Sequence, residues 1–142
     1  MIKNLTIISE FKQLKKAAVH KLVKAVKDQQ KFQIADLNIN FIGSDKLLEL
    51  NRKHLKHYYP TDIITFNYSG SLSELDGEIY ISFEDASINA KKYKVSLNNE
   101  LTRLVIHGIL HLLGYDDKTP SEKKIMKTLE NQLTYKNIFT LL

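Results

Sequence analysis

The spacing of apolar residues changes several times along the first third of the chain, and each change predicts a new element. Leu5–Ile8 has the composition of a short strand, and helical spacing follows from about Glu10 to Gln29. Apolar and polar residues then alternate in ADLNINF, residues 35–41, as expected of a strand with one buried face. A helix is predicted next over roughly Asp45–Leu55, with Ser44 as its cap.

The middle of the chain alternates between breakers and strand-like runs. Pro60 in HYYPTD disfavours helix at the preceding residue and frees the chain to enter the strand IITF, residues 63–66. Asp76-Gly77 is predicted to turn the chain into a second alternating strand, GEIYIS, residues 77–82. The segment FEDASINAKKYK, residues 83–94, is typical of a short amphipathic helix.

The next helix is predicted to be almost wholly apolar. Ser96 is a suitable N-cap, and the run from Leu101 to Leu113 leaves nearly no polar face, so this helix must be buried. Gly114 is expected to end it, because glycine adopts the left-handed conformation without a Cβ penalty.

A last helix is predicted to open with a capping box. Thr119 is its N-cap, Pro120 its first residue and Glu122 the residue that closes the box. Its apolar stripe is expected to consist of Ile125, Leu129 and Leu133. The whole pattern indicates mixed α and β structure, and with no repeat and no Pro/Gly/Ser-rich linker we expect a single domain over residues 1–142.

Composition limits which residues could bind a metal and which partners the chain could have. The chain has no cysteine, so a metal would have to be held by His, Asp or Glu. The longest apolar stretch is too short to span a bilayer, and the N-terminus lacks the apolar core of a signal peptide, so a soluble, cytoplasmic protein without membrane contact is expected. A formal net charge of +5 favours polyanionic partners such as nucleic acid, although the lysine-rich segment near residues 12–27 is better explained as a solvated helix face.

The segment HGILHLLGYDD, residues 107–117, carries the strongest chemical signal. His107 and His111 are one helical turn apart and can bind one ion, and Gly114 followed by Asp117 can return a third ligand. Three protein ligands with an open fourth position are typical of catalytic zinc, whose bound water becomes acidic near neutral pH. The histidines could instead be hydrogen-bonded core residues, and Asp116 is the rival third ligand or a residue that orients an imidazole or caps the turn.

Two further positions bear on the reaction. Gly108 stands where zinc peptidases with His-Glu-x-x-His have their general base, so that peptidase mechanism is excluded. Arg103 lies one turn before His107, where a guanidinium could bind a phosphate and stabilise charge during phosphodiester cleavage. The alternative is an ion pair of Arg103 with Glu100 or with an acidic residue elsewhere in the chain.

The same segment closely resembles HGxLHLxGYDH, the signature of the YbeY family of metal-dependent endoribonucleases, which are involved in ribosomal RNA maturation. PTDIITF is similar to the family's PTDVLSFP block, GEIYIS to its GDIxIS strand, and ELTRLVIHG to the approach to the signature. These blocks occur in family order over roughly Asn51–Asp117. The resemblance implies an α+β fold with a small mixed sheet of about four strands and a zincin-like central helix that carries the metal site.

The resemblance also implies a function. It suggests a single-strand-specific endoribonuclease in ribosomal RNA processing and ribosome quality control, with one divalent ion on His107, His111 and Asp117 and with Arg103 as a catalytic residue. Zinc is the expected ion, and manganese, iron or nickel are the alternatives. The expected partners are ribosomal RNA precursors and ribosome-associated proteins. A ribosome-associated RNA-binding factor with a structural metal, or a metallohydrolase of another substrate, remains the alternative.

Three departures from the family pattern matter. The third histidine of the signature is Asp117 here, a harder oxygen ligand that should loosen any preference for zinc. Where many members have an arginine, this chain has Leu55, so any RNA contact of that arginine is expected to fall on other residues or to be absent. The candidates for RNA binding are Lys53, Lys56, His57 and Arg103. Glu78 replaces the usual aspartate, which is a milder change.

Overall fold

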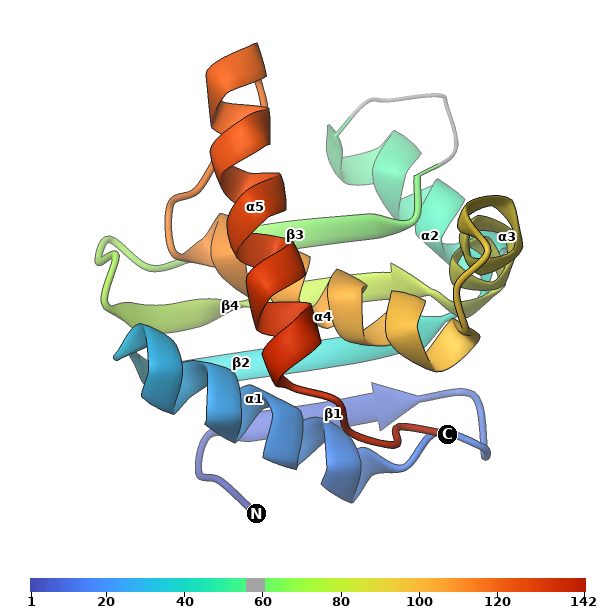
Figure 1. The fold of residues 1–142 in the computed structure, drawn as a ribbon, viewed down its shortest axis with the longest axis horizontal. Helices are drawn as coiled ribbons and strands as arrows, with labels where there is room; N and C mark the ends of the chain where they lie inside the picture. Colours follow the sequence, from blue (N-terminus) through green and yellow to red (C-terminus); the bar gives the residue numbers. More distant parts are fainter. Residues whose placement is uncertain (56–60) are drawn as a thin grey trace.

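The computed structural model describes residues 1–55 and 61–142 of the chain, and its centre is a four-stranded mixed sheet. The strands are β1 (Leu5–Ser9), β2 (Gln33–Ile42), β3 (Ile63–Asn67) and β4 (Glu74–Ser82). Their order is β1-β2-β4-β3, with β1, β2 and β4 parallel and β3 antiparallel at the edge (Figure 1). The α+β class and the small mixed sheet are therefore confirmed.

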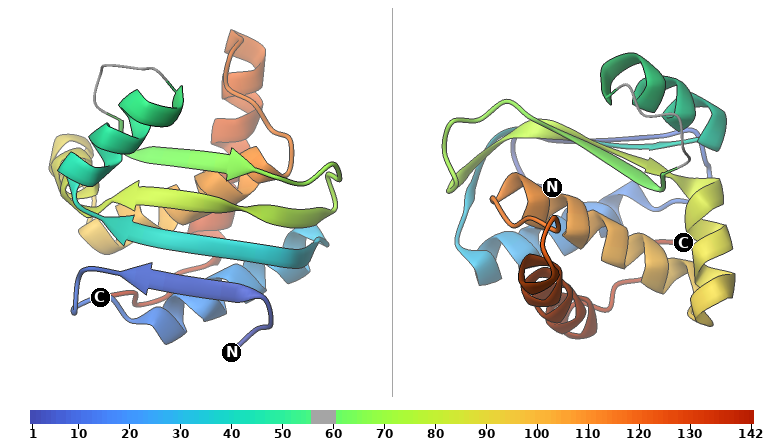
Figure 2. Two further views of the ribbon diagram at one scale, coloured as in Figure 1. Left: turned by 180° about the vertical axis from the view of Figure 1, so that it is seen from behind. Right: turned by 90° about the horizontal axis from the view of Figure 1, so that it is seen from above.

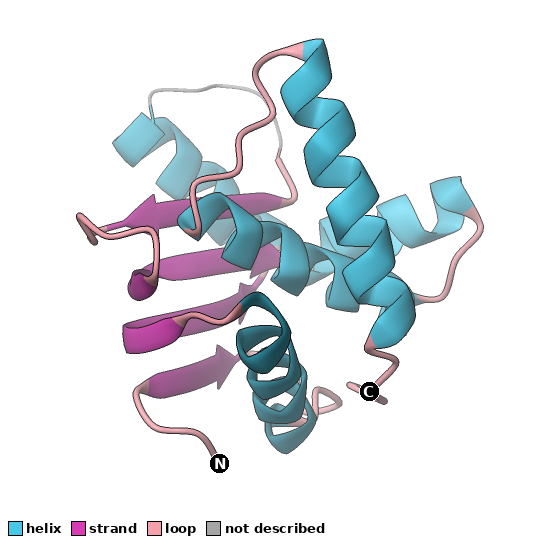
Figure 3. Cartoon of the chain, turned by 60° about the vertical axis from the view of Figure 1, so that its left-hand side comes forward, coloured by secondary structure: helices cyan, strands magenta, loops and turns pink. Residues whose placement is uncertain are grey.

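Helices cover both faces of this sheet unequally. The helical segments are α1 (Lys16–Gln30), α2 (Ser44–Leu50), the π-helix η1 (Asn51–Leu55), α3 (Phe83–Tyr93), α4 (Leu97–Leu112) and α5 (Pro120–Lys136). Helices α1 and α4 lie on one face, α2 lies on the other, and α5 packs outside α4 (Figure 2). Figure 3 shows the resulting separation of the helical layers from the strands. None of the described helices is both long and apolar enough to cross a membrane.

The main core fills the space between the sheet and the layer formed by α1 and α4. Ile39 in β2 pairs with Ile7 in β1 and Ile79 in β4, and all three side chains are buried. Helix α4 adds seven buried apolar residues to this core, as its sequence predicts: Leu101, Leu104, Val105, Ile106, Ile109, Leu110 and Leu112. Because α4 is fixed on both sides, by the sheet and by α5, it is a rigid support for side chains on its remaining face.

The ends of α4 and the start of α5 follow the predicted local chemistry. The Ser96 hydroxyl accepts the Asn99 N–H at 3.0 Å, and Gly114 has φ +98° just beyond the helix. The Thr119 side chain and Glu122 form the reciprocal capping box at the start of α5. These three predictions are confirmed, and each of them depends only on residues that are close together in the sequence.

Two predicted helix starts are wrong. Helix α1 begins at Lys16 rather than Glu10. The Glu10 N–H donates to the Phe41 carbonyl, and the Ser9 hydroxyl accepts the Phe11 N–H at 2.9 Å, so these residues extend the β1 edge into a turn. Ser44 is the first residue of α2 and does not cap it, since Gly43 holds the N-cap position and both the Ser44 N–H and its hydroxyl donate to Glu84.

The predicted turn at Asp76-Gly77 is also wrong, because both residues lie inside β4. A Cβ on Gly77 would come within 2.4 Å of the Phe66 carbonyl oxygen of β3. Gly77 is therefore needed for the close approach of two strands. The predicted stripe of α5 is wrong at Ile125, which is 59% exposed. Met126 and Glu130 take the inward positions together with Leu133.

Candidate metal centre

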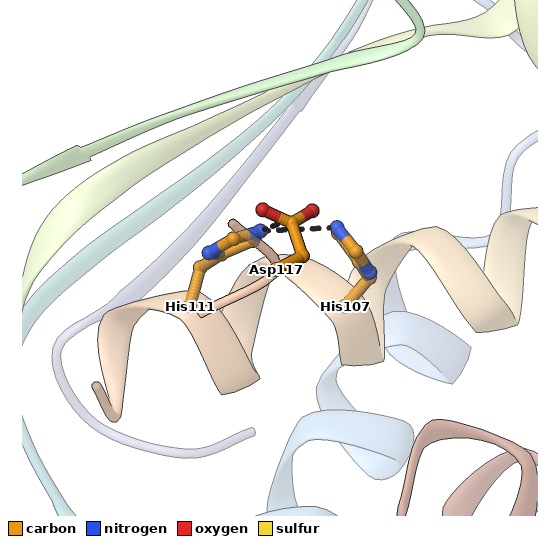
Figure 4. A group of neighbouring side chains, drawn as sticks. All are labelled: His107, His111 and Asp117. Atoms are coloured by element: carbon orange, nitrogen blue, oxygen red, sulfur yellow. Dashed lines mark hydrogen bonds and ion pairs between the residues drawn. The ribbon is translucent and has the colours of Figure 1, made fainter. Parts of the chain in front are cut away.

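Three side chains meet at the C-terminal half of α4. The Nε2 atoms of His107 and His111 are 3.1 Å apart, and the Asp117 Oδ2 lies 3.6 Å from the His111 Nε2. One ligand atom from each of the three residues lies within 4.8 Å of the others, so they can hold one metal ion. His107, His111 and Asp117 together form the candidate metal group. Figure 4 shows the two rings facing each other from the helix, with the Asp117 carboxylate between them in this view.

The turn after α4 brings Asp117 back to the two histidines. The Tyr115 N–H donates to the Leu110 carbonyl at 3.0 Å, which closes the end of the helix around Gly114. The Asp116 side chain accepts the Asp117 N–H at 2.8 Å and so holds the turn. Of the two adjacent aspartates, only Asp117 joins the group of metal-ligating atoms among the described residues.

His107 is oriented by a residue that the sequence did not indicate. Its Nδ1 lies 2.6 Å from the Oε2 of Glu130, which is on α5 and nearly buried. Since an ionised carboxylate only accepts, the His107 Nδ1 is the donor in this contact, which leaves the Nε2 as the ring atom that faces His111. The signal that could have found Glu130 is a charged residue at an inward position of α5, four residues after Met126.

Burial and neighbouring groups set the protonation states of Glu130 and His111. Burial by itself raises the pKa of Glu130, but the hydrogen bonds from His107 and Arg103 outweigh it and lower the pKa below its ordinary value. Burial, followed by the nearby charge of His107, lowers the pKa of His111. Near neutral pH, Glu130 is therefore a carboxylate and His111 a neutral imidazole, which is the form that binds metals.

Arg103 ties the carboxylates of the site together. Its Nε and Nη2 donate to the two oxygens of Glu100 at 2.8 and 2.6 Å, and its Nη1 donates to the Oε1 of Glu130 at 2.6 Å. The ion pair with Glu100, one of the two predicted roles, is therefore present. The guanidinium has five N–H donors, and these bonds use three of them, so two remain for another acceptor.

Asp62 completes the polar surroundings of Arg103. Its Oδ2 accepts a hydrogen bond from Asn89 at 2.9 Å and lies 3.9 Å from the Arg103 Nη2. Burial raises the pKa of Asp62, and the Arg103 charge offsets part of that shift. The aspartate of the PTD block thus faces the same arginine as Glu100.

Gly108 lies on the side of α4 that packs against the sheet, not on the side that carries the two histidines. A Cβ at this position would lie 2.9 Å from two side-chain atoms of Ile79 and 3.2 Å from Ile63. The sequence lacks the glutamate of the zinc peptidases at this position. The packing adds a second reason, because a glutamate side chain here would collide with the core.

The predicted RNA-binding residues fall in different places. Arg103 lines a cleft of about 530 Å³ together with His107 and Asp117. Lys53 lies on η1 and lines two other clefts, neither of which includes a residue of the metal group. Lys56 and His57 lie outside the described residues.

Known proteins match most of this chain in sequence. The family model "Endoribonuclease YbeY" matches residues 2–137. A curated relative of that name from Parabacteroides distasonis is 41% identical over 119 residues, covering 84% of this chain and 83% of the relative. Another, from Cytophaga hutchinsonii, is 35% identical over 123 residues, covering 87% and 86%.

A solved structure is similar as well. The solution structure of TM1509 from Thermotoga maritima matches with a TM-score of 0.66 and 26% sequence identity. The match covers 92% of this chain and 86% of that protein. The fold is therefore shared over most of both chains.

Proposed function

Because this chain belongs to the YbeY family of endoribonucleases, we propose that it cleaves single-stranded ribosomal RNA at a divalent metal held by His107, His111 and Asp117. Family membership makes it an RNA-cleaving hydrolase. The observation that carries the metal-dependent mechanism is the convergence of three ligand atoms within 4.8 Å beside a cleft.

The donor set fits a divalent ion. Two imidazole nitrogens and one carboxylate oxygen suit zinc, and the oxygen also suits manganese, iron or nickel. We propose zinc as the resident ion. When bound, such an ion supplies a Lewis acid that lowers the pKa of water and polarises a phosphoryl oxygen.

The protein side chains have separate tasks in this proposal. Glu130 fixes the tautomer and orientation of His107 by accepting a hydrogen bond from its Nδ1–H. Arg103 holds Glu130 in place, and its two unused N–H donors are available to phosphate oxygens in the cleft. Arg103 is thus proposed as a positioning residue and as a contact for the scissile phosphate.

The proposed setting is the cytoplasm, with ribosomal RNA precursors as substrates and ribosome-associated proteins as partners. A net charge of +5 supports binding to such a polyanion. Encounter with RNA should therefore slow as salt concentration rises.

The test is cleavage of a single-stranded ribosomal RNA fragment by the metal-loaded protein and by His111→Ala, with the metal content of both measured by elemental analysis. We expect metal and cleavage in the parent and the loss of both in the variant. His54→Ala controls for the removal of a histidine, since His54 is exposed on η1 and outside the metal group, and its metal content should equal the parent's. Bound metal without RNA cleavage under several divalent ions would contradict the proposal.

A further inference from the structure

The cleft that contains the metal centre continues away from it along α4. It is bordered by α5 on one side and reaches Tyr93 at the end of α3. We propose that this cleft is the path of a single RNA strand, in which Lys123 and Lys127 contact phosphates and Tyr93 stacks on a base. This inference rests on the proposed endoribonuclease function and names the residues that position its substrate.

The two lysines are suited to bind phosphates. Lys123 and Lys127 are one turn apart on α5, so they lie on the same side of the helix, and both line the cleft. Within the part of the chain that the structure describes, neither ammonium group forms an ion pair or a hydrogen bond. They are exposed cations with no internal partner to give up when RNA binds.

The acidic residues of the cleft are bonded to partners other than these lysines or belong to the three-residue metal site. Glu100 and Glu130 are buried and hydrogen-bonded to Arg103, and Glu130 is bonded to His107 as well. Asp117 belongs to the metal group, where a divalent ion would balance its charge. Lys123 and Lys127 are therefore the unpaired cations among the described residues of the cleft's α5 side.

Tyr93 adds an aromatic surface at the far end. Its side chain is 58% exposed, although tyrosine rings usually contribute to the core. The Lys92 Nζ lies 5.5 Å from the ring centroid, so a cation accompanies the ring. Proteins that bind single strands combine a basic groove with aromatic rings on which bases stack, and a base held in a duplex is not free to do so.

The arrangement predicts a strand that runs past the metal centre. Phosphates would follow the α5 side of the cleft, and a base beyond the scissile bond would reach the Tyr93 ring. The N-terminal half of α5 extends beyond the sheet edge in Figure 1, and the two lysines that it contributes to the cleft are exposed.

The test compares Lys123→Ala/Lys127→Ala and Tyr93→Ala with two matched controls. Lys124→Ala and Tyr135→Ala remove the same types of side chain from exposed positions on α5 that do not line the cleft. Binding of a labelled single-stranded RNA of about 12 nucleotides is measured by fluorescence anisotropy over a range of salt concentrations. Cleavage of that RNA and of a dinucleotide gives kcat and KM, and elemental analysis gives the metal content.

We expect the double lysine variant to bind about tenfold more weakly and to lose about 1.4 from the slope of log affinity against log salt. Tyr93→Ala should weaken binding at least about fivefold. Both variants should keep the parent's metal content, and their loss should be smaller on the dinucleotide, which offers fewer phosphates and bases to contact. The two controls should match the parent in every measurement.

The outcomes separate this inference from the function on which it rests. If the parent cleaves RNA and the cleft variants bind it as tightly as the controls do, the path is overturned and the function stands. If the parent does not cleave RNA, the proposed function fails, and the anisotropy data still decide whether RNA occupies the cleft.

Discussion

The Nδ1 of His107 lies 2.6 Å from the Oε2 of Glu130, although 23 positions separate the two residues in the sequence. This contact joins α4 to α5 at the level of the metal centre. The other oxygen of Glu130 accepts from Arg103, which is in turn bonded twice to Glu100. The geometry of one metal ligand therefore depends on the packing of a helix that contributes no ligand itself.

Replacing Glu130 by glutamine should weaken metal binding about 10- to 100-fold, as is usual when the carboxylate behind a ligating histidine is lost. The amide is of similar size, but it is neutral and has one oxygen, so it cannot accept hydrogen bonds from both the His107 Nδ1–H and the Arg103 guanidinium as two carboxylate oxygens do. Metal affinity is measured by competition with a chromophoric chelator. Glu49→Gln, at an exposed position of α2, should leave the affinity unchanged. Equal affinities in the two variants would show that Glu130 does not position His107.

The same carboxylate should make folding stability depend on pH. Its pKa is lowered in the folded protein, so its stabilising contribution is complete above the ordinary value of 4.5 and is lost as pH falls through the lowered pKa. At neutral pH, Glu130→Gln should cost about 3 kcal/mol in the free energy of unfolding, because it leaves the Arg103 charge less compensated. Urea unfolding should show this difference shrinking as the pH falls below 4.5. A difference that stays constant into acid would mean that the Glu130 charge contributes nothing.

Gly108→Ala tests the packing of α4 on the sheet. The new Cβ would lie 2.9 Å from two atoms of Ile79, a fully buried residue of β4, so a well-packed side chain must shift. We expect a loss of about 1–3 kcal/mol in the free energy of unfolding, in spite of the higher helix propensity of alanine. Gly70→Ala is the control, since nothing lies within 4 Å of its Cβ position. Thermal or urea unfolding measures both, and a stabilised Gly108→Ala protein would mean that α4 has free space against β4.

The features that could be predicted from sequence are those set by close neighbours along the chain. Ser96 and Thr119 cap helices through N–H groups three residues away, and His107 and His111 share a face because they are four apart. The reversal at Gly114 that returns Asp117 likewise spans only a few residues. Local chemistry therefore identifies the three residues of the metal group.

The features that could not be predicted depend on contacts between distant segments. Asp76-Gly77 has the chemistry of a turn, but the Phe66 carbonyl of the neighbouring strand requires a glycine there. On α5, apolarity favours Ile125 as a buried residue, whereas the inward position belongs to the charged Glu130. Glu130 is tolerated there because Arg103 and His107 donate to it, and no local pattern contains those partners.

Asp117→His tests how the third side chain sets the metal preference. An imidazole nitrogen in place of a carboxylate oxygen makes the donor set softer and removes one negative charge, which favours zinc over manganese. We expect the ratio of zinc to manganese affinity to rise on the order of tenfold, which corresponds to about 1.4 kcal/mol. Asp116→His is the matched control, because it makes the same chemical change one residue earlier, at a side chain that supports the turn but lies outside the metal group.

The zinc and manganese affinities of each variant are measured by competition titration. Thermal unfolding with and without zinc checks that the variants remain folded. A ligand that binds only the folded state at 100 times its Kd adds about 2.7 kcal/mol of stability, so bound zinc should raise the Tm of Asp117→His clearly. If the ratio changes in Asp116→His and stays constant in Asp117→His, the ligand is the earlier aspartate. The turn would then have to rearrange on metal binding, because the Asp116 carboxylate holds the Asp117 N–H in the present structure.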